Sequence, residues 1–194
     1  MPDHTIAEQN TIKEKLKVIF PDLDVKAQWL AEISGVEKAY SPTTDVSVGP
    51  FAIENQFIND YDKIVRDKKD FFESLIKIHN LNLGQDEIVF DFIKNYNNNS
   101  RCLLAIELEN KTVDNKKHVM GSIINAASLG RFGLLVPIKD DDLVKILQLR
   151  KYIDFLGEVK DRHINIMNCL IVSYAQFVKC LDDFIGSQNN STAR

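Results

Sequence analysis

The chain has 194 residues, of which 44% are hydrophobic, and a formal net charge of −4 at pH 7. This length and composition predict one globular domain with a sizeable core, and they exclude a disordered, collagen-like or repeat protein. The acidic balance argues against a protein that coats nucleic acid through phosphate contacts alone, although residues 101–140 carry six basic and four acidic side chains.

The N-terminal sequence lacks the basic-then-apolar pattern of a signal peptide, and no apolar run is long enough to span a membrane. Three cysteines, Cys102, Cys169 and Cys180, make an odd number, and two of them lie beside or within apolar runs. We expect them to be reduced core residues rather than a disulfide framework or a zinc site. The chain is therefore expected to be cytoplasmic and not bound to a membrane.

The first part of the chain, residues 1–39, is predicted to be helical. Thr11 has capping-box spacing to an acidic residue and starts a helical pattern that ends at Pro21. Asp24 is then expected to cap a second helix, and Gly35 lies just past its end.

The next segment predicts a strand followed by helices. Val46 and Val48 alternate with polar residues, which indicates a short strand that enters a Gly-Pro turn. Residues 54–79 have helical spacing and form either one long helix or two. Residues 87–93 favour a short helix, with a strand as the alternative.

The second half alternates strands and helices. Residues 101–109 are the clearest strand, residues 118–129 form a helix rich in small side chains, and Gly130 is placed as its C-terminal cap. Further strands are expected at 132–138 and 164–174, further helices at 143–155 and 176–185, and a disordered tail at 187–194. This order predicts an α/β fold with a mixed, mostly parallel central sheet flanked by helices, in a single domain of residues 1–186.

The strand at 101–109 ends with two charged residues. Glu107 and Glu109 are two positions apart and therefore point to the same face, and an extension of the strand would add Lys111 to that face. Burying an uncompensated charge is unfavourable, so the carboxylates are expected at a solvated strand end or neutralised by cations. The carboxyl end of a parallel strand is where open α/β sheets bind ligands, and oxygen ligands there suit Mg²⁺ or Mn²⁺.

Three segments, taken in order, resemble a known superfamily. They are residues 41–45 (SPTTD), residues 105–110 (AIELEN) and the small-residue helix and strand at 121–136. Their order is similar to that of the restriction-endonuclease-like, PD-(D/E)XK phosphodiesterases, and especially to an uncharacterised bacterial group with a second glutamate in the motif. The resemblance covers about residues 40 to 140.

The resemblance implies a restriction-endonuclease-like fold and a set of site residues. Asp45 would be the motif aspartate and Glu107 the first strand carboxylate, while Glu109 stands where most members have lysine. These three carboxylates would hold Mg²⁺ or Mn²⁺, and Glu109 is either a general base or a second metal ligand. Lys111 or Lys117 would supply the positive charge of the missing strand lysine.

The chemistry implied is metal-dependent hydrolysis of phosphodiester bonds in DNA by a restriction-type or defence-related endonuclease, active as a homodimer. A catalytically inactive module on the same fold, binding nucleic acid or a protein, is the alternative that the missing lysine favours. Two other residues are left open. Asp91 replaces Asp45 as the motif aspartate if residues 87–93 form a strand, and His118 is expected to make a hydrogen bond at a helix start rather than to act in catalysis.

Overall fold

The computed structural model describes residues 3–32, 42–84, 88–93, 97–110, 116–159 and 166–192. The elements, in chain order, are α1 (Asp3–Ile19), β1 (Val25–Leu30), β2 (Thr43–Val48), α2 (Ile58–Asp67), α3 (Lys69–Leu83), α4 (Phe90–Ile93), β3 (Cys102–Glu109), α5 (Lys116–Leu129), β4 (Gly130–Pro137), α6 (Asp140–Val159), β5 (Cys169–Ile171) and α7 (Tyr174–Thr192).

The described strands form one five-stranded sheet with the order β1-β2-β3-β4-β5. β1, β2 and β3 pair antiparallel, whereas β3, β4 and β5 pair parallel. The expected α/β class is confirmed, but the expectation of a mostly parallel sheet is wrong. A parallel pair needs a crossover connection, and among the described helices only α5 and α6 connect neighbouring strands in that way. The segment with α2, α3 and α4 instead leaves β2 and returns to β3 at the same end of the sheet.

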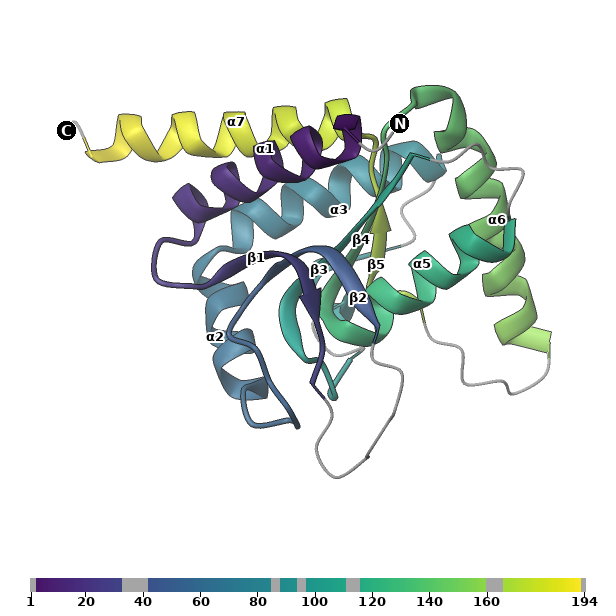
Figure 1. Cartoon of the computed structure of the whole chain (residues 1–194), viewed down its shortest axis with the longest axis horizontal. Helices are drawn as coiled ribbons and strands as arrows, with labels where there is room; N and C mark the ends of the chain where they lie inside the picture. The colour runs from purple at the N-terminus through teal and green to yellow at the C-terminus, as the bar shows by residue number, and fades with distance from the viewer. Residues whose placement is uncertain are drawn as a thin grey trace.

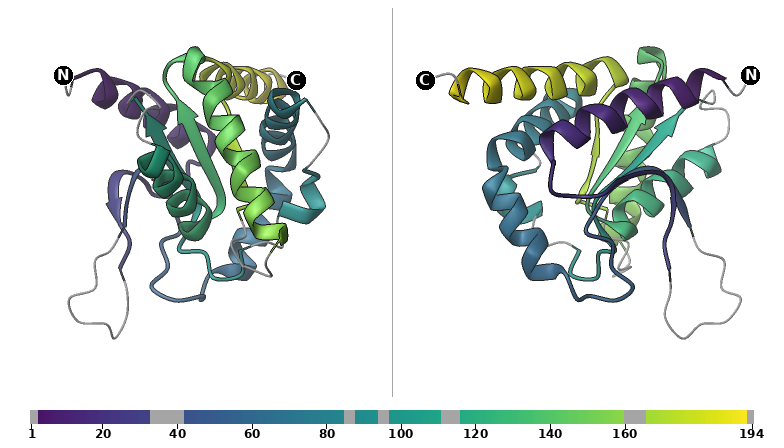
Figure 2. Two further views of the ribbon diagram at one scale, coloured as in Figure 1. Left: turned by 90° about the vertical axis from the view of Figure 1, so that its right-hand side faces the viewer. Right: turned by 60° about the vertical axis from the view of Figure 1, so that its left-hand side comes forward.

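Helices cover both faces of the sheet (Figure 1). α1, α2, α3 and α7 bury their apolar side chains against one face, in a cluster that includes Leu16, Phe72, Leu104 and Phe177. α5 and α6 cover the other face over a second cluster, and the views in Figure 2 show these two layers from the side. β3 lies in the middle of the sheet, and all eight of its residues are buried.

The predicted second helix is a strand, so the expectation of a helical segment over 1–39 is correct only for its first part. Val25 and Trp29 are buried in β1, while Leu30 is 55% exposed. A spacing of four residues lies on one face of a helix and also on one face of a strand. The pattern therefore could not distinguish the two, and Asp24 caps no helix.

The first helix was predicted too short. α1 begins at Asp3, and the Thr11 hydroxyl donates to the Ala7 carbonyl at 3.0 Å, as it does inside a helix rather than at a cap. This earlier start brings two additional helical turns to the sheet.

Most expected elements of the second half are confirmed, with different ends. Gly130 opens β4 instead of capping α5, and a Cβ at this position would lie 2.2 Å from the Phe132 carbonyl oxygen. β5 covers three residues of the predicted strand, Cys169–Ile171. Residues 187–192, expected in a disordered tail, continue α7 to Thr192, because each added residue gains a backbone hydrogen bond once a helix is formed.

The structure shows which of two alternatives holds at each of two segments that the sequence patterns left open. Residues 54–79 contain two helices, α2 and α3, which meet at Lys68. Residues 90–93 form the short helix α4, so Asp91 does not stand on a strand beside β3. The three cysteines are buried, as expected of core residues. No helix in the described ranges is long and apolar enough to cross a membrane.

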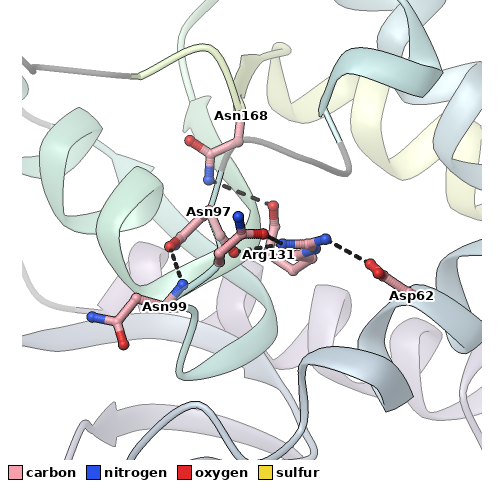
Figure 3. Close-up of polar contacts among 6 residues, drawn as sticks. Asp62, Asn97, Asn99, Arg131 and Asn168 are labelled. Carbon is pink, nitrogen blue, oxygen red and sulfur yellow. Dashed lines mark hydrogen bonds and ion pairs between the residues drawn. The ribbon is translucent and has the colours of Figure 1, made fainter.

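The amino ends of β3 and β4 are closed by a buried polar network (Figure 3). The Arg131 side chain is 1% exposed and donates to Asp62 and to the Asn97 carbonyl, each at 2.6 Å. The side-chain amides of Asn97 and Asn168 both donate to the Gly130 carbonyl, at 2.8 and 3.1 Å. This network holds the turn from α5 into β4.

Candidate active site

The pairing of β2 with β3 brings two predicted site residues together. Val46 pairs with Ile106, and the same antiparallel register places Asp45 opposite Glu107, one position farther along. Glu107 is 9% exposed and Glu109, two positions along β3, is 2% exposed. These values exclude a solvated strand end, so the buried carboxylates need hydrogen bonds or a cation to offset the loss of hydration.

Asp45 is held by three hydrogen bonds. Its Oδ1 accepts from the side-chain amides of Gln9 at 2.8 Å and Gln28 at 3.0 Å, and its Oδ2 accepts from the Leu108 backbone N–H at 2.7 Å. Burial raises the pKa of the Asp45 carboxyl, and these hydrogen bonds oppose that shift. Asp45 is therefore fixed between α1, β1 and β3.

Gln28 holds Asp45 from a rarely used backbone conformation. Its φ is 50°, the one positive φ at a non-glycine residue in the part of the chain described. A left-handed conformation costs an L-residue about 1–2 kcal/mol. Such strain is typically found at functional sites, where the surrounding structure maintains it.

Glu107 lies against α5 and near the other two carboxylates. Its Oε1 accepts a hydrogen bond from the Asn125 side-chain amide. Burial, followed by the negative charge of Asp45, raises the pKa of Glu107 to about 8, and Glu109 adds to this effect while Asn125 opposes it. The three carboxylates thus form an electrostatically coupled cluster that a cation would stabilise.

His118 stands in the first turn of α5, as expected, and lies close to this cluster. Its Nε2 lies 3.6 Å from the Glu109 Oε2. The charge of His118 also acts to lower the pKa of Asp45. The first turn of α5 therefore brings an imidazole to the carboxylates at the end of β3.

A cavity of about 630 Å³ opens beside Glu107. It is lined by the start of β2 and by one side of α5, namely Pro42, Thr43, Glu107, Lys117, His118, Gly121, Ser122, Ile124, Asn125 and Ser128. This volume is within the range of small-molecule and cofactor sites. Lys117 thus lies at the cavity, whereas Lys111, the other predicted cation, lies outside the described residues.

The donor chemistry of the cluster fits a hard divalent cation. Asp45, Glu107 and Glu109 offer carboxylate oxygens, which Mg²⁺ and Mn²⁺ prefer, and their mutual repulsion favours a bound positive charge. Their side chains nevertheless point to separate protein partners. Among the described residues, no three His, Cys, Asp or Glu side chains converge as a group that could hold a metal ion. A metal would therefore require these side chains to turn from their present hydrogen bonds.

α1 contributes residues to this end of the sheet that the sequence patterns did not indicate. Besides Gln9, the Thr5 hydroxyl accepts from the Asn110 amide at 3.0 Å, and the buried Glu8 Oε2 finds no hydrogen-bond partner among the described residues. The predicted helix began at Thr11, so these positions were assigned to the helical N-terminal portion but to no place at the site. The same periodicity, continued toward the N-terminus from Ile12, would have included them.

Comparison of the chain with models of known protein families, with curated proteins and with solved structures found no match.

Proposed function

We propose that the chain is a metal-dependent nuclease that hydrolyses phosphodiester bonds in DNA, of the restriction or defence type. The observation that carries the proposal is the electrostatically coupled cluster beside a cavity, in which Glu107 and Glu109 are buried and Asp45 is half-buried. Buried like charges reduce the stability of a fold, and groups with strongly perturbed pKa values concentrate at functional sites.

The residues around the cavity have distinct roles in this proposal. Asp45, Glu107 and Glu109 would hold Mg²⁺ or Mn²⁺, which supplies an activated water and offsets the charge of the phosphorane-like transition state. The Glu107 carboxyl must lose its proton to bind a cation. Metal affinity is therefore expected to increase as the pH is raised toward about 8, the pKa of Glu107. Lys117 and His118 line the cavity and would bind the phosphate groups of the substrate.

The proposal includes a restriction-endonuclease-like fold and a cytoplasmic location. Support for the fold comes from the two carboxylate-bearing strands, β2 and β3, followed by the crossover helix α5 and the parallel strand β4. The three free cysteines support a reducing compartment.

The test is a plasmid-cleavage assay with Mg²⁺ or Mn²⁺, comparing the wild type with Glu107→Ala and Glu107→Gln. We expect cleavage by the wild type and a loss of at least about 100-fold in both variants, since even indirect contacts to a metal contribute about 10–100-fold. Glu14→Gln, a change on the exposed face of α1, is the matched control and should cleave normally. Equal cleavage by wild type and Glu107→Ala would remove this cluster from the mechanism.

The second candidate is a catalytically inactive module that binds nucleic acid or a protein through the same cavity. It is favoured by the hydrogen bonds that occupy both oxygens of Asp45 and by the position of Glu109, where lysine is usual in the superfamily that the sequence resembles. Calorimetric titration with Mn²⁺ distinguishes the candidates. The nuclease is expected to bind the ion and lose that binding on Glu107→Gln, whereas the inactive module releases no heat and cleaves neither DNA nor RNA.

A further inference from the structure

A groove of about 520 Å³ runs between α3 and α7, on the face of the molecule opposite α5. Its apolar lining includes Ile78, Leu81, Cys180 and Phe184. Leu81, the last α3 residue of this lining, is 71% exposed. An apolar surface strip with charged borders is typical of a site for protein contact.

The two helices that border the groove run antiparallel. At one end the rings of Phe71 and Phe184 lie 5.4 Å apart. At the other end the Asn82 amide donates to the Gln176 side chain at 2.9 Å. The start of α3 therefore lies beside the later turns of α7.

Four exposed charged side chains line the groove, and their signs are separated along it. Asp70 and Asp183 lie toward the phenylalanine end, and Lys77 and Lys179 lie nearer the middle. At a rise of 1.5 Å per residue, the acidic and basic positions are about 10 Å apart along α3 and about 6 Å apart along α7. Within the described ranges, none of the four forms an ion pair.

We propose that this surface, the α3–α7 groove, binds the α3–α7 groove of a second copy of the chain in a two-fold symmetric dimer. With the two-fold axis across the groove, each patch meets itself in the opposite direction. The acidic end of one groove then faces the basic middle of the other, and the four ion pairs frame a shared apolar centre at Cys180 and Phe184.

The charge of the groove favours a second copy over other occupants. It carries two acidic and two basic side chains, so it has no excess of positive charge for nucleic acid and is its own electrostatic complement. The dimer is independent of the proposed cleavage, because the cavity beside Glu107 lies on the other face and stays open.

Light scattering during size-exclusion chromatography of the wild type should give twice the 22.2 kDa mass of the chain at high micromolar concentration. The double variant Lys77→Glu/Lys179→Glu should be monomeric, because every ion pair becomes repulsive. The opposite variant, Asp70→Lys/Asp183→Lys, should also be monomeric alone. An equimolar mixture of the two variants should recover the dimer, since each then faces its complement.

The matched control is Lys63→Glu/Lys151→Glu, which makes the same charge change at exposed positions on α2 and α6 and should remain dimeric. Circular dichroism of each variant establishes that it is folded. A monomeric wild type, or charge-reversed variants that stay dimeric, would overturn the proposal. Plasmid cleavage by Lys77→Glu/Lys179→Glu is a separate readout, so loss of the dimer and loss of the nuclease are distinguishable.

Discussion

The two ends of the parallel pair β3–β4 both bury polar groups, but they satisfy them in opposite ways. At the amino end, the Arg131 guanidinium meets the Asp62 carboxylate and the Asn97 carbonyl. At the carboxyl end, Glu107 lies near two further carboxylates, and its pKa is raised to about 8. One end pairs opposite charges, whereas the other gathers like charges.

This difference separates a structural role from a functional one. The Arg131 network joins the loop before β3, the end of α5 and the loop before β5, so each contact stabilises the fold (Figure 3). The carboxylate cluster also accepts hydrogen bonds, from Gln9, Gln28 and Asn125, but the mutual repulsion of its charges opposes folding. A fold that maintains such a cluster in its central strand is expected to use it for a ligand.

The largest effect on stability is expected at the amino end. Arg131→Met removes the buried partner of the half-buried Asp62 carboxylate and the hydrogen bond to the Asn97 carbonyl, and should destabilise the protein by about 2–3 kcal/mol. Urea denaturation monitored by circular dichroism measures this change. Lys63→Met, a substitution at an exposed lysine, should leave the midpoint unchanged. A loss for Arg131→Met no larger than that of this control would show that the network does not hold the fold.

At the carboxyl end of the parallel pair, the charged group is expected to destabilise the fold instead of stabilising it. The folded-state pKa of Glu107 lies above its ordinary value, so the stabilising protonated form is present at low pH and is lost as pH rises toward about 8. The wild type should lose on the order of 1 kcal/mol per pH unit between about pH 5 and about pH 8. Asp45, whose pKa is also raised, contributes in the same direction.

Glu107→Gln should flatten this pH dependence and make the protein more stable than the wild type near pH 8, while cleavage is lost. Urea midpoints measured across the pH range test both statements. If the stability of the variant and that of the wild type depend on pH in the same way, the ionised Glu107 carboxylate does not destabilise the fold.

A smaller effect is expected from the amide that supports Glu107. Asn125→Ala removes a hydrogen bond to the ionised carboxyl, so the pKa of Glu107 should rise further. Stability should change by about 1 kcal/mol, and cleavage should fall by about 10–100-fold. Ser122→Ala, in the same cavity, is the control with little effect on either. Unchanged cleavage by Asn125→Ala would limit this residue to packing.

The smallest effect on stability is expected at Gly121, which lines the cavity and is not packed in the core. A Cβ at Gly121 meets no atom within 4 Å, so Gly121→Ala should stabilise α5 by about 0.5–1 kcal/mol. Gly121→Leu should keep the fold but fill the cavity and reduce cleavage. Gly133→Ala is the contrasting control, because its Cβ would lie 2.7 Å from the Ala126 carbonyl carbon and should destabilise. Full cleavage by folded Gly121→Leu would place the substrate elsewhere.

Local patterns predicted much of the second half of the chain. The apolar run of β3 and the small-residue helix α5 could be recognised because periodicity and composition agree over several turns or pleats. The same rules failed at Val25 and Trp29, where a four-residue spacing fits both a helix and a strand. They also placed the end of the closing helix too early, since a polar composition lowers but does not prevent helix formation in α7.

The sequence by itself determined that Glu107 and Glu109 share one face at the end of a central strand, because side chains alternate along any strand. Only the tertiary structure decided their surroundings. The register of β2 brought Asp45 to Glu107, and the crossover helix α5 added Asn125 and His118. Contacts between residues far apart in the chain depend on packing of the whole sheet and its helices, which no local pattern encodes.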